Sequence, residues 1–366
     1  MLLVKQSAFW MILVGIVSLS GIVIFEVLLR LFAPQPYIYP RYQYSERYGQ
    51  TLYPSTVMVA ERPGHWRFTY TTNEFGLRGP TVPVSNRYEL PNIAIIGDSY
   101  TFGNGVNDGE PYPAILADLL AVRANVVNLG VPGYGLAQQI RHFYEFGQVY
   151  QPSIVLLQFT NNDPADNLFY RVAKIEDGRF VFQGDRSIGP ILRRIKDFLA
   201  NSIVQRSQAY NFVRDRLYDT MRARKVANAS DANAKRGMIS SEERLHNDLL
   251  ELFVEDLRDR GIEVVLFGVD GHLAEFPGIM AKVKQLDDRG LLTYVTSEPW
   301  FEDVSDYASP EGHAWGAKAH RIVAHELAPI LGAKLAGAPP RSAGSQRHDV
   351  DGAVPKARVV NTGEHD

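Results

Sequence analysis

The sequence predicts an α/β protein in which helices cover both faces of a parallel sheet. Short, continuous apolar runs stand at 93–96, 153–159 and 262–269, and such runs are typical of strands buried on both faces. Segments with apolar residues at helical spacing separate these runs. This alternation of strand and helix along the chain indicates a parallel sheet rather than an antiparallel one.

The first element, before the sheet, is an uncharged apolar segment at residues 8–25. As a helix its 18 residues extend about 27 Å, close to the roughly 30 Å of a bilayer core. No small-residue cleavage site follows, and prolines stand in the "LFAPQP" that comes next, so the sequence favours an uncleaved anchor over a signal peptide or a core helix. Lys5 favours a cytoplasmic N-terminus, although Arg30 and Arg41 oppose it. We therefore expect a single-pass protein whose main domain is extracytoplasmic, in the periplasm.

The next elements belong to the main domain and its insertion. Residues 66–72 alternate bulky and polar side chains, as in a strand. A helix is expected at about 112–123, a strand at 124–130, and helical spacing follows at 136–150. A hairpin turning at Asp177-Gly178 and basic amphipathic helices then interrupt the order, and they suggest a lid, a partner surface or a membrane-facing surface as alternatives to an ordinary solvated face.

The last elements complete the sheet. Ser240 and Glu243 have the spacing of a capping box and open a helix that stops at Gly261. A weaker strand follows at 291–296, and a final helix is expected with Ser309 as its cap and Pro310 at its first position. The expected domains are 1–33 as membrane anchor, 34–90 as juxtamembrane linker with a small β region, 91–333 as the α/β domain with its insertion at 171–239, and 334–366 as a disordered tail.

Composition excludes several classes of function. The chain has no cysteine, which rules out disulfides, thiolate metal sites and a cysteine nucleophile. Its net charge of −3, without a basic block, gives no sign of a nucleic-acid partner. No cofactor is expected. Asp163, Asp166 and Asn167 lie close together in sequence, but such a group more often organises a loop than binds a metal.

Polar residues follow the predicted strands where the carboxyl ends of a parallel sheet place ligand sites. Gly97-Asp98-Ser99 ends the first strand, and Glu311-Gly312-His313 opens the expected last helix. Acyl transfer needs a nucleophile, a base and an acid that orients the base. Ser99, His313 and Glu311 are the candidates for these three roles. In one alternative interpretation, Ser99 is a simple turn residue. In another, His272 rather than His313 is the base, but the order of these residues along the chain favours His313.

The oxyanion of acyl transfer also needs hydrogen-bond donors. The candidates are the backbone N–H groups of Ser99 and Gly133 and the side-chain amide of Asn162. Glycine at 133 suits this role because the absence of a Cβ lets the backbone approach a substrate closely. The rival interpretation of Asn162 is a residue that only caps a turn.

Together these residues resemble the four blocks of the SGNH (GDSL-type) hydrolases, over about residues 91–331. "NEFGLRG" before the first strand and "NDPADN" after the third are similar to a membrane-anchored bacterial subset of that family. The resemblance implies a three-layer, flavodoxin-like parallel sheet, here with an N-terminal transmembrane helix and a helical and hairpin insertion. It also implies ester hydrolysis or acyl transfer, often on O-acetylated glycans or lipids.

Two blocks depart from the family pattern. Thr160 stands where the third block usually has glycine. The last block is normally D-x-x-H, but Pro310 stands three residues before His313 and Glu311 is out of register. Asp303 or Asp306 is the alternative acid, unless the histidine position lies near Tyr307 and has been lost.

The predicted function is therefore that of a serine esterase that acts through an acyl-enzyme on an ester, of O-acyl type, in an extracytoplasmic glycan or lipid. Membrane contact is expected through the N-terminal helix. One alternative is a polysaccharide O-acyltransferase, with the insertion shielding the acyl-enzyme from water. The other, from a different class, is a non-catalytic glycan-binding or assembly protein on a hydrolase fold.

Overall fold

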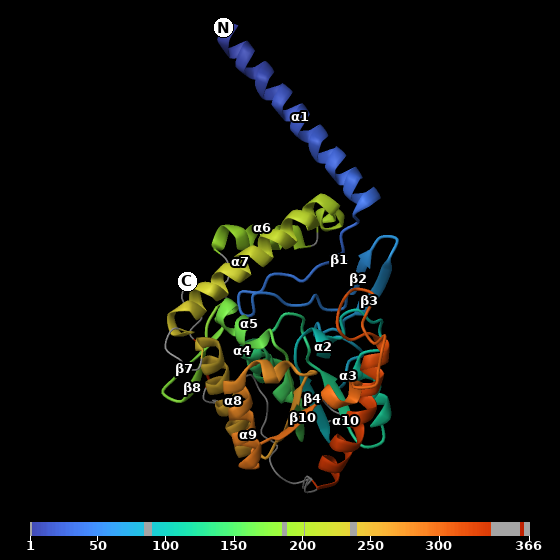
Figure 1. The fold of residues 1–366 in the computed structure, drawn as a ribbon, viewed down its shortest axis with the longest axis vertical. Coiled ribbons are helices and arrows are strands. Elements are labelled where there is room, and N and C mark those ends of the chain that lie inside the picture. Colours follow the sequence, from blue (N-terminus) through green and yellow to red (C-terminus); the bar gives the residue numbers. More distant parts are fainter. Residues whose placement is uncertain are drawn as a thin grey trace.

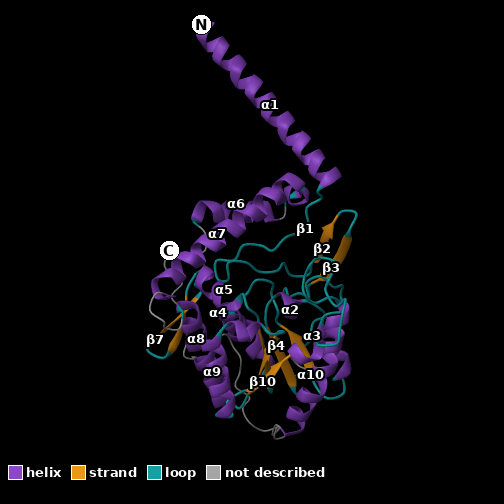
Figure 2. Cartoon of the chain, in the orientation of Figure 1, coloured by secondary structure: helices purple, strands orange, loops and turns teal. Residues whose placement is uncertain are grey.

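The structure, a computed structural model, confirms the α/β fold with a central parallel sheet (Figure 1, Figure 2). It describes residues 2–83, 90–184, 189–200, 202–234, 240–337 and 359–361.

The central sheet has five parallel strands in the order β10-β9-β6-β4-β5. Read from β5, this is the flavodoxin-like order 2-1-3-4-5. The order in which the chain adds strands reverses at the boundary between β4 and β6. Sites in such sheets form at the carboxyl ends of the strands beside this switch point. The strand bounds are Asn92–Ile96 for β4, Asn125–Asn128 for β5, Ile154–Phe159 for β6, Glu263–Gly268 for β9 and Thr293–Thr296 for β10.

Helices cover both faces of this sheet (Figure 2). Ile93 and Ile95 of β4 belong to the core on the side of α3 and α10, whereas Ala94 and Ile96 belong to the core on the side of α4, α8 and α9. Because successive side chains of a strand point to opposite faces, a strand covered on both faces is apolar over most of its length, as β4 is from Ile93 to Ile96. The helix bounds are Tyr112–Leu119 for α3, Leu136–His142 for α4, Ser241–Asp259 for α8, Pro277–Asp288 for α9 and Ala317–Gly337 for α10.

A small antiparallel sheet, β1-β2-β3, precedes the main domain. The strand expected at 66–72 is present as β3. Within the stretch 34–90, predicted as a juxtamembrane linker with a small β region, Tyr48 and Tyr70 are buried with Phe102 and Tyr134 of the main domain. Its tyrosines therefore form a third core over the ends of the main strands. The bounds are Tyr37–Tyr39 for β1, Val57–Arg62 for β2 and Trp66–Thr71 for β3.

The insertion contains the expected hairpin and helices. β7 and β8 pair with their turn at Asp177-Gly178, where both residues have positive φ. β11 then pairs with β8 from the far end of the chain. The bounds are Asp163–Tyr170 for α5, Ala173–Glu176 for β7, Arg179–Phe182 for β8, Pro190–Ala200 for α6, Ile203–Arg206 for the 3-10 helix η4, Gln208–Ala234 for α7 and Val359–Asn361 for β11.

The stretch 334–366, expected to be disordered, is partly ordered. α10 continues to Gly337 because Leu331 and Leu335 still pack on the core, and β11 lies within the same stretch. The rest of the expected tail lies outside the described residues. The remaining helices are short: α2 Ser99–Phe102, η2 Phe143–Gly147, η3 Gln148–Tyr150, η5 His272–Glu275 and η6 Glu298–Phe301.

Local capping patterns predict the start of one helix correctly and the start of another wrongly. Ser240 and Glu243 form the expected capping box of α8. The last helix, however, begins at Ala317 and not at Pro310. The Ser309 hydroxyl donates to the Gly105 carbonyl at 2.8 Å instead of capping a helix, and Gly312 has a φ of +99°, which no right-handed helix contains. Residues 309–316 therefore form a loop.

α1, Leu2–Phe32, projects away from the rest of the chain (Figure 1). Its segment Phe9–Phe32 is long and apolar enough to cross a membrane, and a signal sequence would share these properties.

Candidate active site

Ser99 begins α2 directly after β4, at the carboxyl edge of the sheet. Asp98 caps this helix by accepting a hydrogen bond from the Tyr100 N–H at 3.1 Å. Gly97 has no room for a side chain, since a Cβ would lie 2.2 Å from Thr101 Oγ1 and 2.5 Å from Gln158 Oε1. The Gly-Asp-Ser order therefore lets the strand turn sharply and leaves the Ser99 hydroxyl at the edge.

His313 meets Ser99 across 214 residues of sequence. Its Nε2 lies 3.2 Å from Ser99 Oγ, within hydrogen-bond distance. The Tyr100 ring packs against the imidazole, with 4.3 Å between the ring centroids. Burial lowers the pKa of His313 below 6.5, while the charges of Asp98 and Asp270 oppose this shift. A largely neutral imidazole at neutral pH follows, as a base requires.

Glu311 is not placed to orient His313, contrary to the expectation. Its carboxylate accepts a hydrogen bond from the Tyr70 hydroxyl at 3.2 Å. Burial raises the pKa of Glu311, although the Tyr70 hydrogen bond and the Arg78 charge act against it. Because Gly312 takes a positive φ between Glu311 and His313, the two side chains enter different surroundings.

The other nitrogen of His313 has a backbone partner. The Trp315 N–H lies 3.4 Å from Nδ1, a long hydrogen bond. Within the described part of the chain, no hydrogen bond joins His313 to Glu311, Asp303 or Asp306. A carboxylate triad of the kind suggested by the sequence is therefore not formed by those three acids.

Asp270 is the acid that the sequence argument passed over. It follows β9 and accepts hydrogen bonds from the Ser297 hydroxyl at 3.0 Å and from Trp315 Nε1 at 3.3 Å. Its charge raises the pKa of His313 through space. The signal was present in Asp270-Gly271-His272 at the end of a buried strand. His272 itself lies near Tyr100, with 6.1 Å between the ring centroids.

The two other predicted donors, Gly133 and Asn162, follow β5 and β6, the neighbours of β4. Gly133 has a φ of +75°, and Gln50 from the N-terminal region lies beside it, donating to the Pro132 carbonyl at 2.6 Å. The Asn162 amide donates to Asp166 at 2.8 Å. A primary amide carries two N–H groups, so this bond leaves one for another acceptor.

A buried polar network joins the ends of β4 and β6 beneath Ser99. Asp98 accepts from Gln158 Nε2 at 3.0 Å. The Thr160 hydroxyl lies 3.0 Å from the second Asp98 oxygen and 2.8 Å from Asn162 Oδ1. Thr160, which replaces the usual glycine of the third block, thus ties the Ser99 turn to the Asn162 loop.

Asp163, Asp166 and Asn167 organise this loop, as expected. Asp163 accepts from the Thr160 N–H at 3.0 Å, and Asn167 accepts from the Ala137 N–H at 2.8 Å. Burial raises the pKa of Asp166, and Arg222 of α7 opposes this with two hydrogen bonds of 2.8 and 3.0 Å. Among the described residues, no three or more acidic or histidine side chains are grouped in a way suited to a metal ion. Through Arg222 the insertion supports the Asn162 loop.

Arg78, in the "NEFGLRG" stretch, is a structural residue that the sequence argument did not identify. Its buried guanidinium donates to the carbonyls of Phe102 at 2.8 Å, Val106 at 2.7 Å and Gly103. It also lies over the Tyr70 ring, 4.6 Å from the centroid. Arg78 therefore fixes the turn that follows the Ser99 helix.

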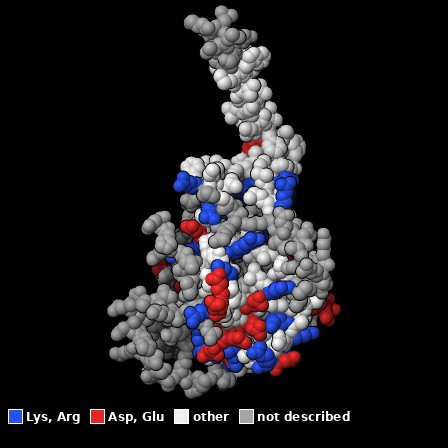
Figure 3. Space-filling view, turned by 90° about the vertical axis from the view of Figure 1, so that its left-hand side faces the viewer, with Lys and Arg blue, Asp and Glu red and all other residues white. Residues whose placement is uncertain are grey.

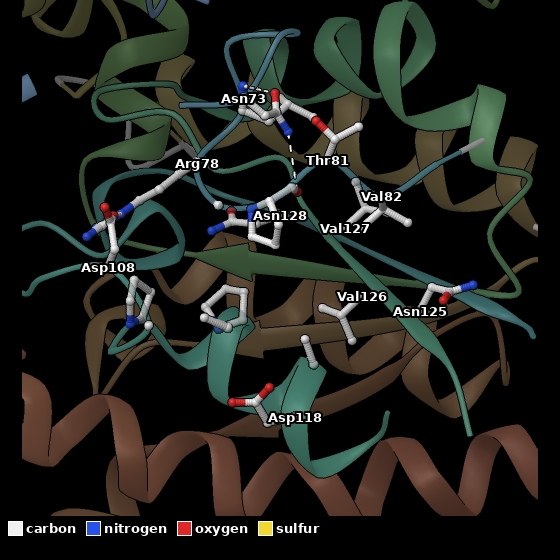
Figure 4. Close-up of a pocket in the computed structure, with 18 of the residues that line it drawn as sticks. Asn73, Arg78, Thr81, Val82, Asp108, Asp118, Asn125, Val126, Val127 and Asn128 are labelled. Atoms are coloured by element: carbon white, nitrogen blue, oxygen red, sulfur yellow. Dashed lines mark hydrogen bonds and ion pairs between the residues drawn. The ribbon is translucent and has the colours of Figure 1, made fainter. Parts of the chain in front are cut away.

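A separate cavity of about 860 Å³ lies along the edge strand β5 (Figure 4). Its lining includes Arg78, Thr81, Asp118 and Asn128, and does not include Ser99 or His313. Arg78 both lines this cavity and supports the Ser99 turn. The cavity is nevertheless separate from the Ser99–His313 pair.

Known proteins resemble this chain in sequence and in fold. The family model described as GDSL-like Lipase/Acylhydrolase family matches residues 95–290. No curated protein matches the chain. Among solved structures, a G-D-S-L family protein from Desulfitobacterium hafniense is 11% identical with a TM-score of 0.40, covering 65% of this chain and 98% of its own. A carbohydrate acetylesterase family member from Sinorhizobium meliloti is 12% identical with a TM-score of 0.37, covering 68% and 100%. A lipase/acylhydrolase from Enterococcus faecalis is 11% identical with a TM-score of 0.38, covering 67% and 97%.

Proposed function

The chain belongs to the GDSL-like lipase/acylhydrolase family and is an ester hydrolase, and from this premise we propose that Ser99 is its nucleophile and His313 its general base. The observation that supports the proposal most directly is the 3.2 Å separation of Ser99 Oγ and His313 Nε2. A base within this distance can take the hydroxyl proton as the oxygen attacks.

The proposed reaction has two halves. Ser99 Oγ forms a bond to the ester carbonyl carbon while His313 Nε2 takes its proton, and the N–H groups of Ser99, Gly133 and Asn162 hold the oxyanion. The C–O bond to the alcohol then breaks, and the imidazolium returns the proton to the leaving alcohol. Water repeats these steps on the acyl-enzyme and releases the acid.

His313 must carry its proton on Nδ1 to act as a base through Nε2. The Trp315 N–H, at 3.4 Å from Nδ1, favours the opposite tautomer, so this long contact opens in the reactive state. Asp98 and Asp270 then stabilise the imidazolium electrostatically, as both charges oppose the lowering of the His313 pKa. In this proposal Asp270 takes the place given to Glu311 by the sequence.

The proposed substrate is an O-acyl ester of an extracytoplasmic glycan or lipid. Support comes from α1, which is retained in this proposal as an anchor with the cytoplasm on the N-terminal side, and from the family resemblance. The active domain then faces the periplasm.

A fluorophosphonate probe tests the proposed nucleophile. We expect the full-length protein in detergent to gain one probe mass, on the peptide that contains Ser99. Heat-unfolded protein serves as the control, since an unactivated serine does not react. Absence of labelling in protein that melts cooperatively would remove the proposed mechanism and favour the non-catalytic, glycan-binding alternative.

The pH dependence tests His313. Because burial lowers the pKa of His313, the neutral base persists below pH 6.5, and kcat/KM should fall to half only at a pH below that value. Asp270→Asn removes a negative charge that raises this pKa, so the acidic limb should move to still lower pH. A limb at or above pH 6.5, or one that stays in place in Asp270→Asn, contradicts the assignment. The measurement is kcat/KM for a water-soluble acetate ester across the acid range.

A further inference from the structure

The insertion carries an apolar surface, here named the α6 face, made of side chains from α6 and the neighbouring η4. All are large, apolar and exposed. The members are Ile191 at 76%, Leu192 at 49%, Ile195 at 48%, Phe198 at 80% and Ile203 at 76% exposure. An isolated apolar side chain on a surface is ordinary, but a contiguous group of this kind marks an interaction site.

The polarity of α6 is inverted relative to that of an ordinary surface helix. Two of its three basic side chains point toward the domain: Arg193 lies 5.6 Å from the Tyr44 ring centroid, and Lys196 Nζ lies 3.3 Å from the Gly49 carbonyl. A helix on a soluble protein packs its apolar face inward and exposes its polar face. Because α6 does the reverse, its outer face suits an apolar environment rather than water.

The α6 face lies at the foot of α1 (Figure 1). Glu26 of α1 accepts hydrogen bonds from the Ser207 hydroxyl at 2.8 Å and from the backbone N–H groups of Gln208 at 3.0 Å and Ala209 at 2.8 Å, the start of α7. The rings of Phe25 and Phe212 pack edge to face, 5.4 Å apart. α1 and the insertion are therefore fastened together where the apolar helix meets the domain.

We propose that the α6 face lies in the interfacial layer of the same phospholipid bilayer that α1 spans. A helix in the membrane plane inserts its apolar side chains below the headgroups and is helped by nearby cations that meet anionic lipids. Arg194 is exposed beside the apolar side chains, and Lys and Arg groups surround the foot of α1 (Figure 3). The inference rests on the proposed anchoring by α1 and not on the chemistry of Ser99.

Membrane seating of this face would also hold the active site near the bilayer. α7 continues from the Glu26 contact to Arg222, whose two hydrogen bonds hold Asp166 beside Asn162. The contact with α1 and the support of the Asn162 loop thus share one helix, α7.

Site-directed spin labelling tests the proposal directly, because the natural chain has no cysteine to interfere. Single cysteines replace Ile195, Phe198 and, on α1, Ile16 in the full-length protein. Val122→Cys is the matched control, since Val122 is an apolar side chain with 88% exposure on α3's side of the domain. Each labelled protein is reconstituted into vesicles of phosphatidylethanolamine and phosphatidylglycerol. Collision rates are then measured with oxygen, which concentrates in lipid, and with a water-soluble nickel chelate.

We expect the oxygen-to-nickel ratio to be several-fold higher at 195 and 198 than at 122, and highest at 16. Water-like ratios at 195 and 198 together with a lipid-like ratio at 16 would overturn the inference while leaving the anchor intact. Water-like ratios at all positions would remove the anchor as well. Spin–spin broadening at 195 or 198 that disappears when labelled protein is diluted with unlabelled protein would assign the face to a second copy, and would equally overturn the lipid proposal. Cooperative melting of each variant verifies its folding.

Discussion

Ser99→Ala should lower kcat/KM for ester hydrolysis by at least about 10³-fold, because it removes the oxygen that we propose as the nucleophile. His313→Ala should cost a similar factor, since its Nε2 is the group placed 3.2 Å from Ser99 Oγ. Residues that act as one unit are non-additive, so the double variant should be little worse than either single variant. Steady-state hydrolysis of a water-soluble acetate ester measures all three.

Ser305→Ala is the matched control for this series. Ser305 is an exposed serine in the loop before His313, and its backbone carbonyl accepts a hydrogen bond from Lys318 Nζ at 2.8 Å. Its loss should leave kcat/KM unchanged. If Ser99→Ala kept more than about a tenth of wild-type activity, a different nucleophile would be required.

Arg78→Ala should lower the free energy of unfolding by about 3–5 kcal/mol. The substitution leaves the carbonyls of Phe102, Gly103 and Val106 without their donor, and it removes the ion pair with Asp108. Each buried, unsatisfied carbonyl costs about 1–3 kcal/mol, partly recovered by water entering the gap. Chemical denaturation of the detergent-solubilised full chain, followed by tryptophan fluorescence, measures the loss.

Two further variants separate the geometry of Arg78 from its charge. Arg78→Lys keeps the charge but lacks the planar fork that reaches several acceptors, so it should lose roughly half as much as Arg78→Ala. Arg67→Ala removes an exposed arginine from β3 and should change stability by less than about 0.5 kcal/mol. Equal stability of Arg78→Ala and Arg67→Ala would show that the buried guanidinium does not hold the turn.

Much of the fold could be predicted from sequence because the deciding forces are local or periodic. β4, β6 and β9 are covered on both faces, so they are apolar over most of their lengths, and short apolar runs identify them. The capping box at Ser240 needs only residues three apart. Gly97-Asp98-Ser99 was identifiable because a strand end, a glycine without room for a Cβ and a serine occur together.

The partners of His313 could not be predicted in the same way. Glu311 is two residues from His313, yet the positive φ of Gly312 separates them, while Asp270 is brought close from the end of another strand. The prediction of where the last helix starts was wrong for a related reason. Ser309 and Pro310 are a strong local helix signal, but the Ser309 hydroxyl bonds to Gly105, which is 204 residues away.

By itself the sequence determined the strands of the central sheet and their order along the chain, the place of Ser99 and the apolar N-terminal helix, since each depends on neighbours along the chain. Tertiary structure alone decided which side chains meet at the site and which face of a helix is exposed. For α6, periodicity reveals two faces, but only the contacts of Arg193 and Lys196 with the domain show that the apolar face points outward. Side chains distant in sequence meet only when loops and packing fix their directions, and no local pattern encodes those directions.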